Sequence, residues 1–310
     1  MKFSVFNFQF PLEFAGAARR RPGGASQLSV LLSLVALALL AAGSPPARAD
    51  EPAAAKRLLL LGQGPDGHPP TTHEYLAGLR ILKKCLDRVP GIDAKVVAAD
   101  EPFRSGPELI DGADGVVIFL AEGAKWIQQD EARLAALERL AGRGGALVGL
   151  HWGIGCRDER YIDRYVRLLG GCHGGPDRKF AVVNVTTEIA APEHPVMTRV
   201  APLVVEDEFY YRLKFAKQDG SVLPLLRVPV EGELYAVAWA WERPDKGRSF
   251  GFSGLHFHSN WKHAGYRRMT AQGIVWTLKL PIRPEGLGVD IAEDDLKLEK
   301  ELKIENCCPH

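Results

Sequence analysis

The sequence has few cysteines and no strong charge of either sign, and each shortage excludes a class of protein. Its 310 residues include 5 Cys, none of them in a C-x-x-C pair. This excludes a disulfide scaffold, a dithiol redox motif and a zinc ribbon. The 39 Lys and Arg residues nearly balance the 38 Asp and Glu residues, whereas nucleic-acid binding needs a clustered basic face. We therefore expect no nucleic-acid partner.

No apolar run is long enough to cross a membrane as a helix. The longest, residues 30–42, is shorter than the roughly 20 residues that a span needs. It follows an arginine triplet at 19–21 and precedes an A-x-A sequence that ends at Ala49. This order predicts a signal peptide over 1–49, cleaved after about Ala49, with a periplasmic or secreted location and no membrane span after cleavage. A membrane anchor is the alternative.

Removal of residues 1–49 would take away five basic residues and one acidic residue, which changes the formal net charge from +1 to −3. All 5 cysteines would remain. Export would permit a disulfide between Cys156 and Cys172. Free thiols are the alternative.

Short apolar runs alternate with helical periodicity in the first half of the remaining chain. Strands are predicted over 57–63, 95–99, 115–120 and 146–150, and helices over 74–89, 126–143 and 157–169. This alternation indicates an α/β fold with a parallel sheet covered on both faces. In the second half, the strands predicted over 180–189, 203–213, 221–230, 235–242 and 249–253 suggest antiparallel additions at the sheet edge, before a helix over 266–280.

The sequence therefore predicts one three-layer α/β/α domain with a mainly parallel sheet. The domain spans 57–282, after a linker over 50–56, and a charged C-terminal tail follows over 283–310.

The segment GALVGLHWGIGC (145–156) has the pattern of a sharp turn after a buried strand. In several α/β enzyme families such a turn presents a Ser or Cys nucleophile. Here the central residue is His151, flanked by Gly149 and Gly153. A histidine excludes acyl-transfer chemistry of the Ser or Cys kind at this position. It leaves general acid–base work, oxyanion polarisation or metal ligation.

Several of the 9 histidines follow predicted strands. His73 and Gln63 come after the first strand and His151 after the fourth, and ligands of such sheets bind at the carboxyl ends of the strands. We expect these side chains to converge there. His256 and His258 would share a face if their segment is extended, and H-x-H is a spacing suited to metal ligation. Hydrogen bonding within loops is the alternative for each histidine.

The acidic cluster Glu206-Asp207-Glu208 lies in a predicted strand. Glu206 and Glu208 should point to one face and Asp207 to the other. A pair of carboxylates on one face suits a glycosidase-like pair or a metal site, and an exposed charged strand end is the alternative. Trp152 could stack on a sugar ring, with core packing as the alternative.

Seven segments together resemble the trehalose-utilisation, or ThuA-like, family. They run in family order over 57–280: LLLLGQGPDGHPPTTHEY, GLHWG, YVRLLGG, EHPVMTRV, the D-E-x-Y element at 207–210, YAVAWAWE and GRSFGFSGLHFHSNW. The resemblance implies the flavodoxin-like fold of the class I glutamine amidotransferases and an association with trehalose and related disaccharides, often alongside 3-keto-sugar oxidoreductases. It carries over His151, Asp207, Glu208 and His256. His258 departs from the commoner form, in which a single histidine follows Leu-Gly.

These observations predict an exported protein of carbohydrate catabolism that acts on a disaccharide or its 3-keto derivative. The reaction class is left open between hydrolase, lyase and isomerase, and a glutaminase is not expected. A carbohydrate-binding domain without catalysis is the alternative. The expected partner is a small carbohydrate, with self-association left open. The expected catalytic residues are His151, Glu208 and His256; the substrate-binding residues are Gln63, His73, Trp152, Asp207, Tyr210 and His258; and a divalent cation, Zn or Mn, would bind His73, His151 and His256.

Overall fold

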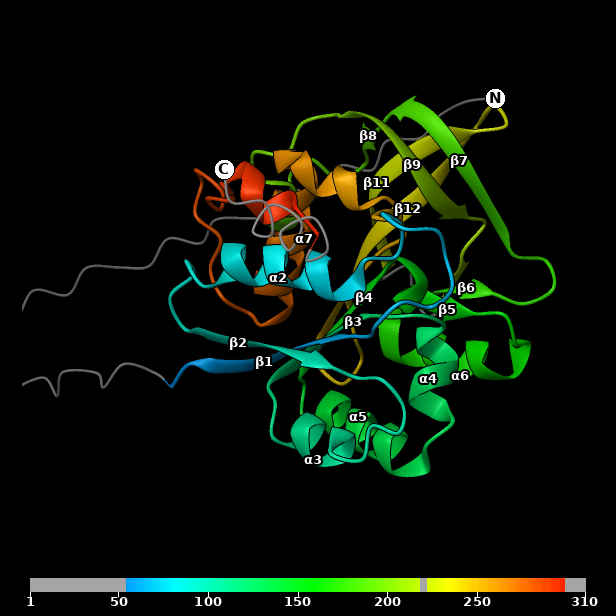
Figure 1. Cartoon of the computed structure of the whole chain (residues 1–310), viewed down its shortest axis with the longest axis vertical. Helices are drawn as coiled ribbons and strands as arrows, with labels where there is room; N and C mark the ends of the chain where they lie inside the picture. The colour runs from blue at the N-terminus through cyan, green and yellow to red at the C-terminus, as the bar shows by residue number, and fades with distance from the viewer. Residues whose placement is uncertain (1–53, 218–221, 299–310) are drawn as a thin grey trace, which may run out of the picture. The chain divides into compact units, whose positions relative to one another are not determined.

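The computed structural model of the chain describes residues 54–217 and 222–298 (Figure 1). The predicted signal peptide and the last part of the charged tail lie outside the described residues. Among the helices that the structure does describe, none is both long and apolar enough to cross a membrane.

The central sheet has eight strands. Its first five strands run parallel and the last three add in antiparallel fashion. β3 and β4 are buried along their whole length, as expected for apolar strands covered on both faces. The predicted α/β fold, with a mainly parallel sheet and antiparallel additions in the second half, is confirmed. The strand order is β2 (Ile92–Ala98), β1 (Lys56–Gly62), β3 (Gly115–Phe119), β4 (Ala146–Leu150), β13 (Arg248–Phe252), β12 (Glu233–Glu242), β11 (Val222–Val230) and β8 (Glu188–Ile189).

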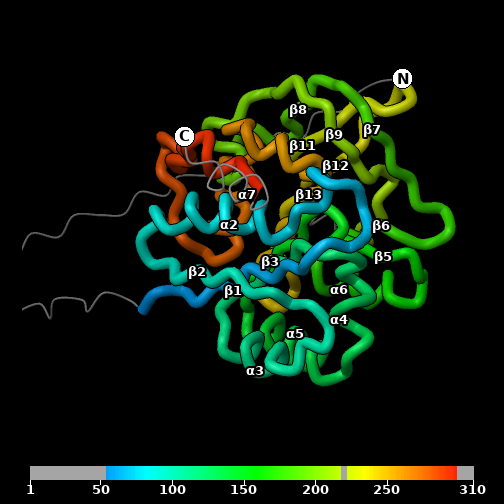
Figure 2. Tube along the Cα trace, in the orientation of Figure 1, coloured from blue at the N-terminus to red at the C-terminus, as the bar shows by residue number. Residues whose placement is uncertain are grey.

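Helices cover both faces of this sheet and produce two separate hydrophobic cores (Figures 1 and 2). On one face, α2 (Tyr75–Leu86) and α7 (Ala264–Thr277) pack on residues such as Leu60 and Val148. The other face packs on residues such as Leu61 and Ile118 and is covered by four helices: α3 (Gly106–Asp111), α4 (Gly123–Gln128), α5 (Glu131–Gly142) and α6 (Ile162–Leu169). The predicted three-layer arrangement is present.

Two smaller sheets lie outside the central sheet. β7 (Lys179–Thr186) pairs with β9 (Val204–Tyr211) as an antiparallel ribbon. β5 (Gly155–Cys156), β6 (Gly171–Gly174) and β10 (Lys214–Phe215) form the other. The described chain also contains five short 3₁₀ helices: η1 (His151–Ile154), η2 (Glu159–Tyr161), η3 (Pro195–Met197), η4 (His258–Lys262) and η5 (Glu293–Leu296).

Three predicted elements differ from the structure, and a capping carboxylate interrupts two of them. The helix predicted over 126–143 is divided into α4 and α5, since Asp130 adopts an extended backbone and its carboxylate accepts the Arg133 N–H as an N-cap. Asp158 likewise caps η2, so α6 begins only at Ile162. The strand predicted over 180–189 is divided between β7 and β8, which belong to different sheets.

The disulfide considered for Cys156 and Cys172 is not formed. Both thiols are free and fully buried. β5 and β6 run side by side, but their register places Cys156 opposite Gly174 rather than opposite Cys172.

The described part of the charged tail packs against the domain. Val289 is fully buried, Leu296 packs on the same core, and the Lys84 Nζ atom lies 2.6 Å from Asp295 Oδ1. Residues 283–298 therefore extend the folded unit beyond residue 282.

The turn after β4 depends on close contact with neighbouring backbone. A Cβ atom on Gly153 would lie 2.1 Å from the Ile118 carbonyl oxygen, and one on Gly123 would lie 2.3 Å from the Gly153 carbonyl oxygen. His151 enters this turn with φ of 45°, in the left-handed region. The predicted sharp turn is present, and the absence of a side chain at Gly153 lets it pack against β3.

Gly153→Ala should lower the free energy of unfolding by about 1–3 kcal/mol, because the added methyl group meets backbone that cannot move aside. Urea unfolding of the purified protein measures the change. Gly142→Ala is the matched control, since a Cβ atom there meets nothing within 4 Å and alanine is the better helix former. Equal stabilities of the two variants would contradict this account of the turn.

Candidate functional site

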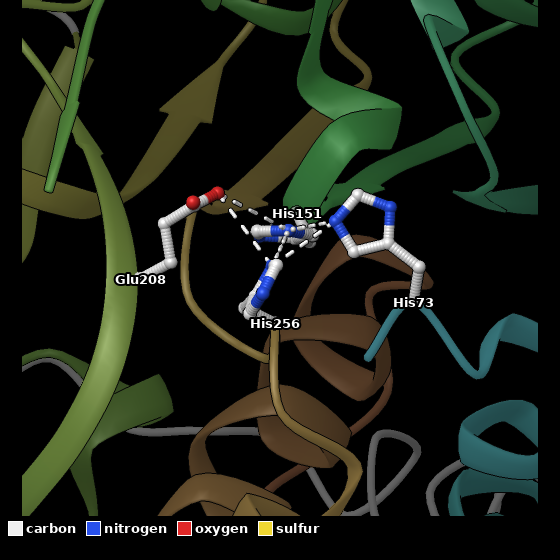
Figure 3. A group of neighbouring side chains, drawn as sticks. All are labelled: His73, His151, Glu208 and His256. Atoms are coloured by element: carbon white, nitrogen blue, oxygen red, sulfur yellow. Dashed lines mark hydrogen bonds and ion pairs between the residues drawn. The ribbon is translucent and has the colours of Figure 1, made fainter. Parts of the chain in front are cut away.

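Three histidines from distant parts of the chain converge at the carboxyl edge of the sheet. His73 lies between β1 and α2, His151 follows β4, and His256 follows β13, with Glu208 of β9 facing them (Figure 3). His73 Nε2 lies 3.0 Å from both His151 Nε2 and His256 Nδ1. The third separation, His256 Nδ1 to His151 Nε2, is 3.2 Å. The structure thus brings together four residues that the sequence identified.

The backbone that presents these histidines is strained. His73, His151 and Leu255 have φ values of 53°, 45° and 76°, which cost about 1–3 kcal/mol each for residues with a side chain. Such strain persists only where surrounding contacts fix the conformation. Here the His73 N–H donates to the His256 carbonyl oxygen at 3.0 Å, so the two loops hold each other.

Hydrogen bonds determine which ring nitrogen carries the proton in two of the histidines. His151 Nδ1 lies 2.8 Å from the carbonyl oxygen of Ser253, which can only accept, so Nδ1 is the donor. His73 Nδ1 lies 2.8 Å from Asp66 Oδ2, and Tyr75 donates its hydroxyl to the same carboxylate oxygen. In the neutral rings, both Nε2 atoms therefore direct lone pairs into the centre of the cluster.

Burial keeps these rings neutral. Burial, followed by the neighbouring imidazoles, lowers the pKa of His151 well below its ordinary value and that of His256 to about 4. Burial also lowers the pKa of His73, against the opposing effect of Asp66. Although burial raises the pKa of Asp66, hydrogen bonds from His73 and Tyr75 hold it well below its usual range. At neutral pH the three imidazoles of the site are therefore uncharged, and the Asp66 carboxylate behind His73 is ionised.

The donor set fits a divalent cation. Lone pairs that face each other at 3.0 Å without a proton between them repel, and a shared cation removes that repulsion. Zinc–nitrogen bonds of about 2.0–2.1 Å in tetrahedral geometry place neighbouring nitrogens about 3.3 Å apart, close to the 3.0–3.2 Å found here. The Asp66–His73 pair also has the carboxylate–histidine arrangement that orients metal ligands.

Glu208 faces the histidines without a hydrogen bond to them. Its Oε1 atom lies 3.6 Å from His256 Nδ1 and 3.9 Å from His151 Nε2. Burial raises the pKa of Glu208. On the same face of β9, the Tyr210 hydroxyl lies 3.0 Å from His151 Nε2, to which it can donate, and its ring stacks on His151. Glu208 can therefore serve as a further ligand or as an acid–base group.

The other two residues of the acidic cluster have different surroundings. Asp207 is fully buried on the opposite face of β9, where its carboxylate accepts the backbone N–H groups of Leu255 at 2.7 Å and His256 at 3.1 Å. It thus positions the His256 loop and lines neither of the two hollows beside the histidine cluster. Glu206 is exposed and lines a different hollow from the one that Glu208 lines. The paired-carboxylate arrangement considered from the sequence is not assembled.

Two hollows adjoin the histidine cluster. The larger, of about 330 Å³, is lined by Gln63, whose side-chain oxygen also accepts the Ala121 N–H. The smaller, of about 150 Å³, is lined by His73, Glu208 and Tyr210. Trp152 lines both. Trp152 and Tyr210 therefore border the hollow that His73 and Glu208 line, whereas Gln63 borders the neighbouring hollow.

His258 lies outside the cluster. The chain after β13 is not a strand, so His256 and His258 do not share a face, and η4 begins at His258. His258 Nε2 lies 3.0 Å from the Leu296 carbonyl oxygen. The H-x-H spacing therefore does not supply two ligands here.

The structure adds residues that the sequence did not single out as site residues. Asp66 and Tyr75 form the hydrogen-bonded second layer behind His73. Three others, His173, Arg157 and Arg178, line the smaller hollow. Asp66 and Tyr75 lie near His73 in the sequence. Their roles can be recognised only once the folded loop shows that the three side chains contact one another.

The comparisons with known proteins agree with this fold. A family model described as ThuA, trehalose utilisation, matches residues 67–277. The chain belongs to this family. The match contains His73, His151, Glu208 and His256, and membership supports a role related to carbohydrate utilisation. A search of curated proteins returned no match.

Solved structures of two ThuA-like proteins show the same fold. One, described as a putative ThuA-like protein from Bacteroides uniformis, has a TM-score of 0.56 at 16% identity, covering 75% of this chain and 95% of that chain. The other, from Parabacteroides merdae, has a TM-score of 0.56 at 13% identity, covering 77% and 94%. These likenesses confirm the expected fold of the family.

The neutral histidines predict that the metal-free protein is less stable in mild acid. A buried histidine with a lowered pKa binds its proton more weakly when folded, so stability is complete above pH 6.5 and is lost as the pH falls towards 4. Asp207 and Glu208 oppose this trend, because burial raises the pKa of Glu208 and raises that of Asp207 to about 7. His73, His151, His173 and His256 outnumber these two carboxyl groups. Urea unfolding with a chelator, from pH 4.5 to 7, should show rising stability, with a smaller slope in His256→Gln; a flat profile would contradict the neutral cluster.

Proposed function

We propose that this ThuA-family protein is a metal-dependent enzyme of carbohydrate utilisation that acts on a disaccharide or its keto derivative outside the cytoplasm. The observation that carries the proposal is the convergence of three uncharged imidazole nitrogens within 3.0–3.2 Å of one another. Support for export comes from the sequence of residues 1–49, and support for the sugar comes from the family.

Zinc is the cation that this donor set favours. Three imidazole nitrogens with room for a further ligand are typical of catalytic zinc sites, whereas manganese prefers sites rich in oxygen. The proposed ligands are His73, His151 and His256. Asp66 and the Ser253 carbonyl oxygen hold two of these rings in the ligating tautomer.

The cation would supply Lewis acidity towards a carbonyl or hydroxyl oxygen of the sugar. Glu208 then transfers the proton at the reacting carbon or oxygen. Its raised pKa suits it to this work, since acid–base groups are most effective when their pKa lies near the working pH. As a ligand, His151 does not shuttle protons, and the Tyr210 hydroxyl beside it becomes available to the sugar. Hydrolysis, elimination and isomerisation can all be catalysed by a Lewis-acidic cation together with one acid–base group.

The purified protein should contain about one zinc ion per chain, measured by elemental analysis. His151→Ala should abolish this binding, and Asp66→Asn should weaken it about 10–100-fold, because His73 loses the partner that orients its ring. His263→Gln is the control, since that histidine lies outside the cluster. Metal-free protein that takes up no zinc, or unchanged zinc affinity in His151→Ala, would contradict the metal site.

Glu208→Gln should retain zinc and lose turnover by about 10²–10⁴-fold, the usual contribution of one acid–base group. The assay follows a panel of disaccharides and their 3-keto derivatives by product analysis. Glu206→Gln is the matched control, because it lies on the same face of β9 and lines a different hollow; it should keep full activity.

Two results would contradict the catalytic role. Full turnover by Glu208→Gln would remove Glu208 from the chemistry. Sugar binding by the zinc-loaded wild type without turnover of any substrate in the panel would favour the non-catalytic binding domain.

A further inference from the structure

The smaller hollow beside Glu208 has a cationic wall that the proposed chemistry does not use. Nine residues line this hollow of about 150 Å³, and Glu208 is the one acid among them. Arg157 and Arg178 contribute two guanidinium groups, and His173 lies in the same lining. Guanidinium groups therefore outnumber carboxylates around the hollow even before any metal binds.

His173 is a buried polar group without a partner of its own. It is 2% exposed, it lies on β6, and its ring stacks on Tyr210 with 4.1 Å between ring centres. Neither ring nitrogen has a hydrogen-bond partner among the residues that the structure describes, and the residue lines the hollow. Burial, together with the charge of Arg178, lowers the pKa of His173 to about 3. The neutral ring thus offers one donor and one acceptor to a ligand.

Arg178 has spare hydrogen-bonding capacity. Its Nη1 atom donates to the Gly175 carbonyl oxygen at 3.2 Å, and within 54–217 and 222–298 no carboxylate lies at ion-pair distance from it. Arg157 is already engaged, because its Nη1 atom lies 3.3 Å from Glu122 Oε1 and its guanidinium group lies over the Trp152 ring. Arg178 is therefore the cation of this wall that lacks a countercharge.

We propose that this hollow binds an anionic oxygen group carried by the sugar, with Arg178 as its charge partner and His173 as a neighbouring hydrogen-bond partner. Guanidinium groups bind carboxylates and phosphates through paired, charge-assisted hydrogen bonds. Trp152 lines the same hollow, and its indole ring suits the apolar face of a sugar ring. The substrate class is then an acidic saccharide, whose charged group lies beside the metal cluster. This inference takes from the proposed function only the premise that the ligand is a saccharide.

Calorimetric titration with three matched probes tests the inference. D-glucuronate carries a carboxylate, D-glucose 6-phosphate carries a phosphate, and D-glucose is neutral. The protein is titrated as purified and again after chelation, so that anion binding at Arg178 is separated from anion binding to a metal. In both states at least one anionic probe should bind at least about tenfold more tightly than glucose, and the tighter of the two identifies the group.

Arg178→Gln should remove this preference and leave the affinity for glucose unchanged. Lys179→Gln is the matched control, since it removes the adjacent charge, which does not line the hollow. His173→Gln should weaken anion binding severalfold while Arg178 is present. Equal binding of glucose and both anions by the wild type, or an unchanged preference in Arg178→Gln, would overturn the inference.

The zinc content of the same preparations separates this inference from the proposed function. Anion selectivity that depends on Arg178 in a protein without zinc would support the anion site and contradict the metal-dependent enzyme. A zinc-loaded, active protein that shows no anion preference would support the enzyme and overturn the anion site.

Discussion

The site depends on one constraint: three buried imidazoles must present lone pairs, rather than protons, to a common point. Hydrogen bonds from outside the cluster meet that constraint for two of the three rings. The Ser253 carbonyl oxygen holds the proton of His151 on Nδ1, and the Asp66 carboxylate does the same for His73. Asp207 anchors the backbone of the His256 loop. Three segments that are far apart in sequence therefore have to be in place before the cluster exists.

Much of the fold follows from local patterns in the sequence. Continuous apolar runs predicted the buried parallel strands, because a strand covered on both faces has no polar side. The left-handed φ of His151 agrees with the sharp turn inferred from Gly149 and Gly153. Helix limits were less accurate: the side chain of Asp130 interrupts an otherwise continuous helical pattern. The separate ribbon of β7 and β9 depends on pairing between distant segments, which no local pattern contains.

The residues of the candidate site could also be predicted in part from the sequence. His73, His151, Glu208 and His256 could be identified because each follows or occupies a strand. The H-x-H spacing alone could not separate His258 from His256, since the distinction depends on where β13 ends and the chain turns. Asp207 resembled a site carboxylate but binds backbone N–H groups. His173 reaches the hollow from β6, which is held between β5 and β10 by pairing that no local pattern predicts.

The most direct test of this account is a crystal structure of zinc-loaded protein with data collected at the zinc absorption edge. The account predicts one anomalous peak within about 2.0–2.1 Å of His73 Nε2, His151 Nε2 and His256 Nδ1, with Asp66 still bonded to His73. A peak elsewhere, or none at this position in zinc-loaded crystals, would contradict it.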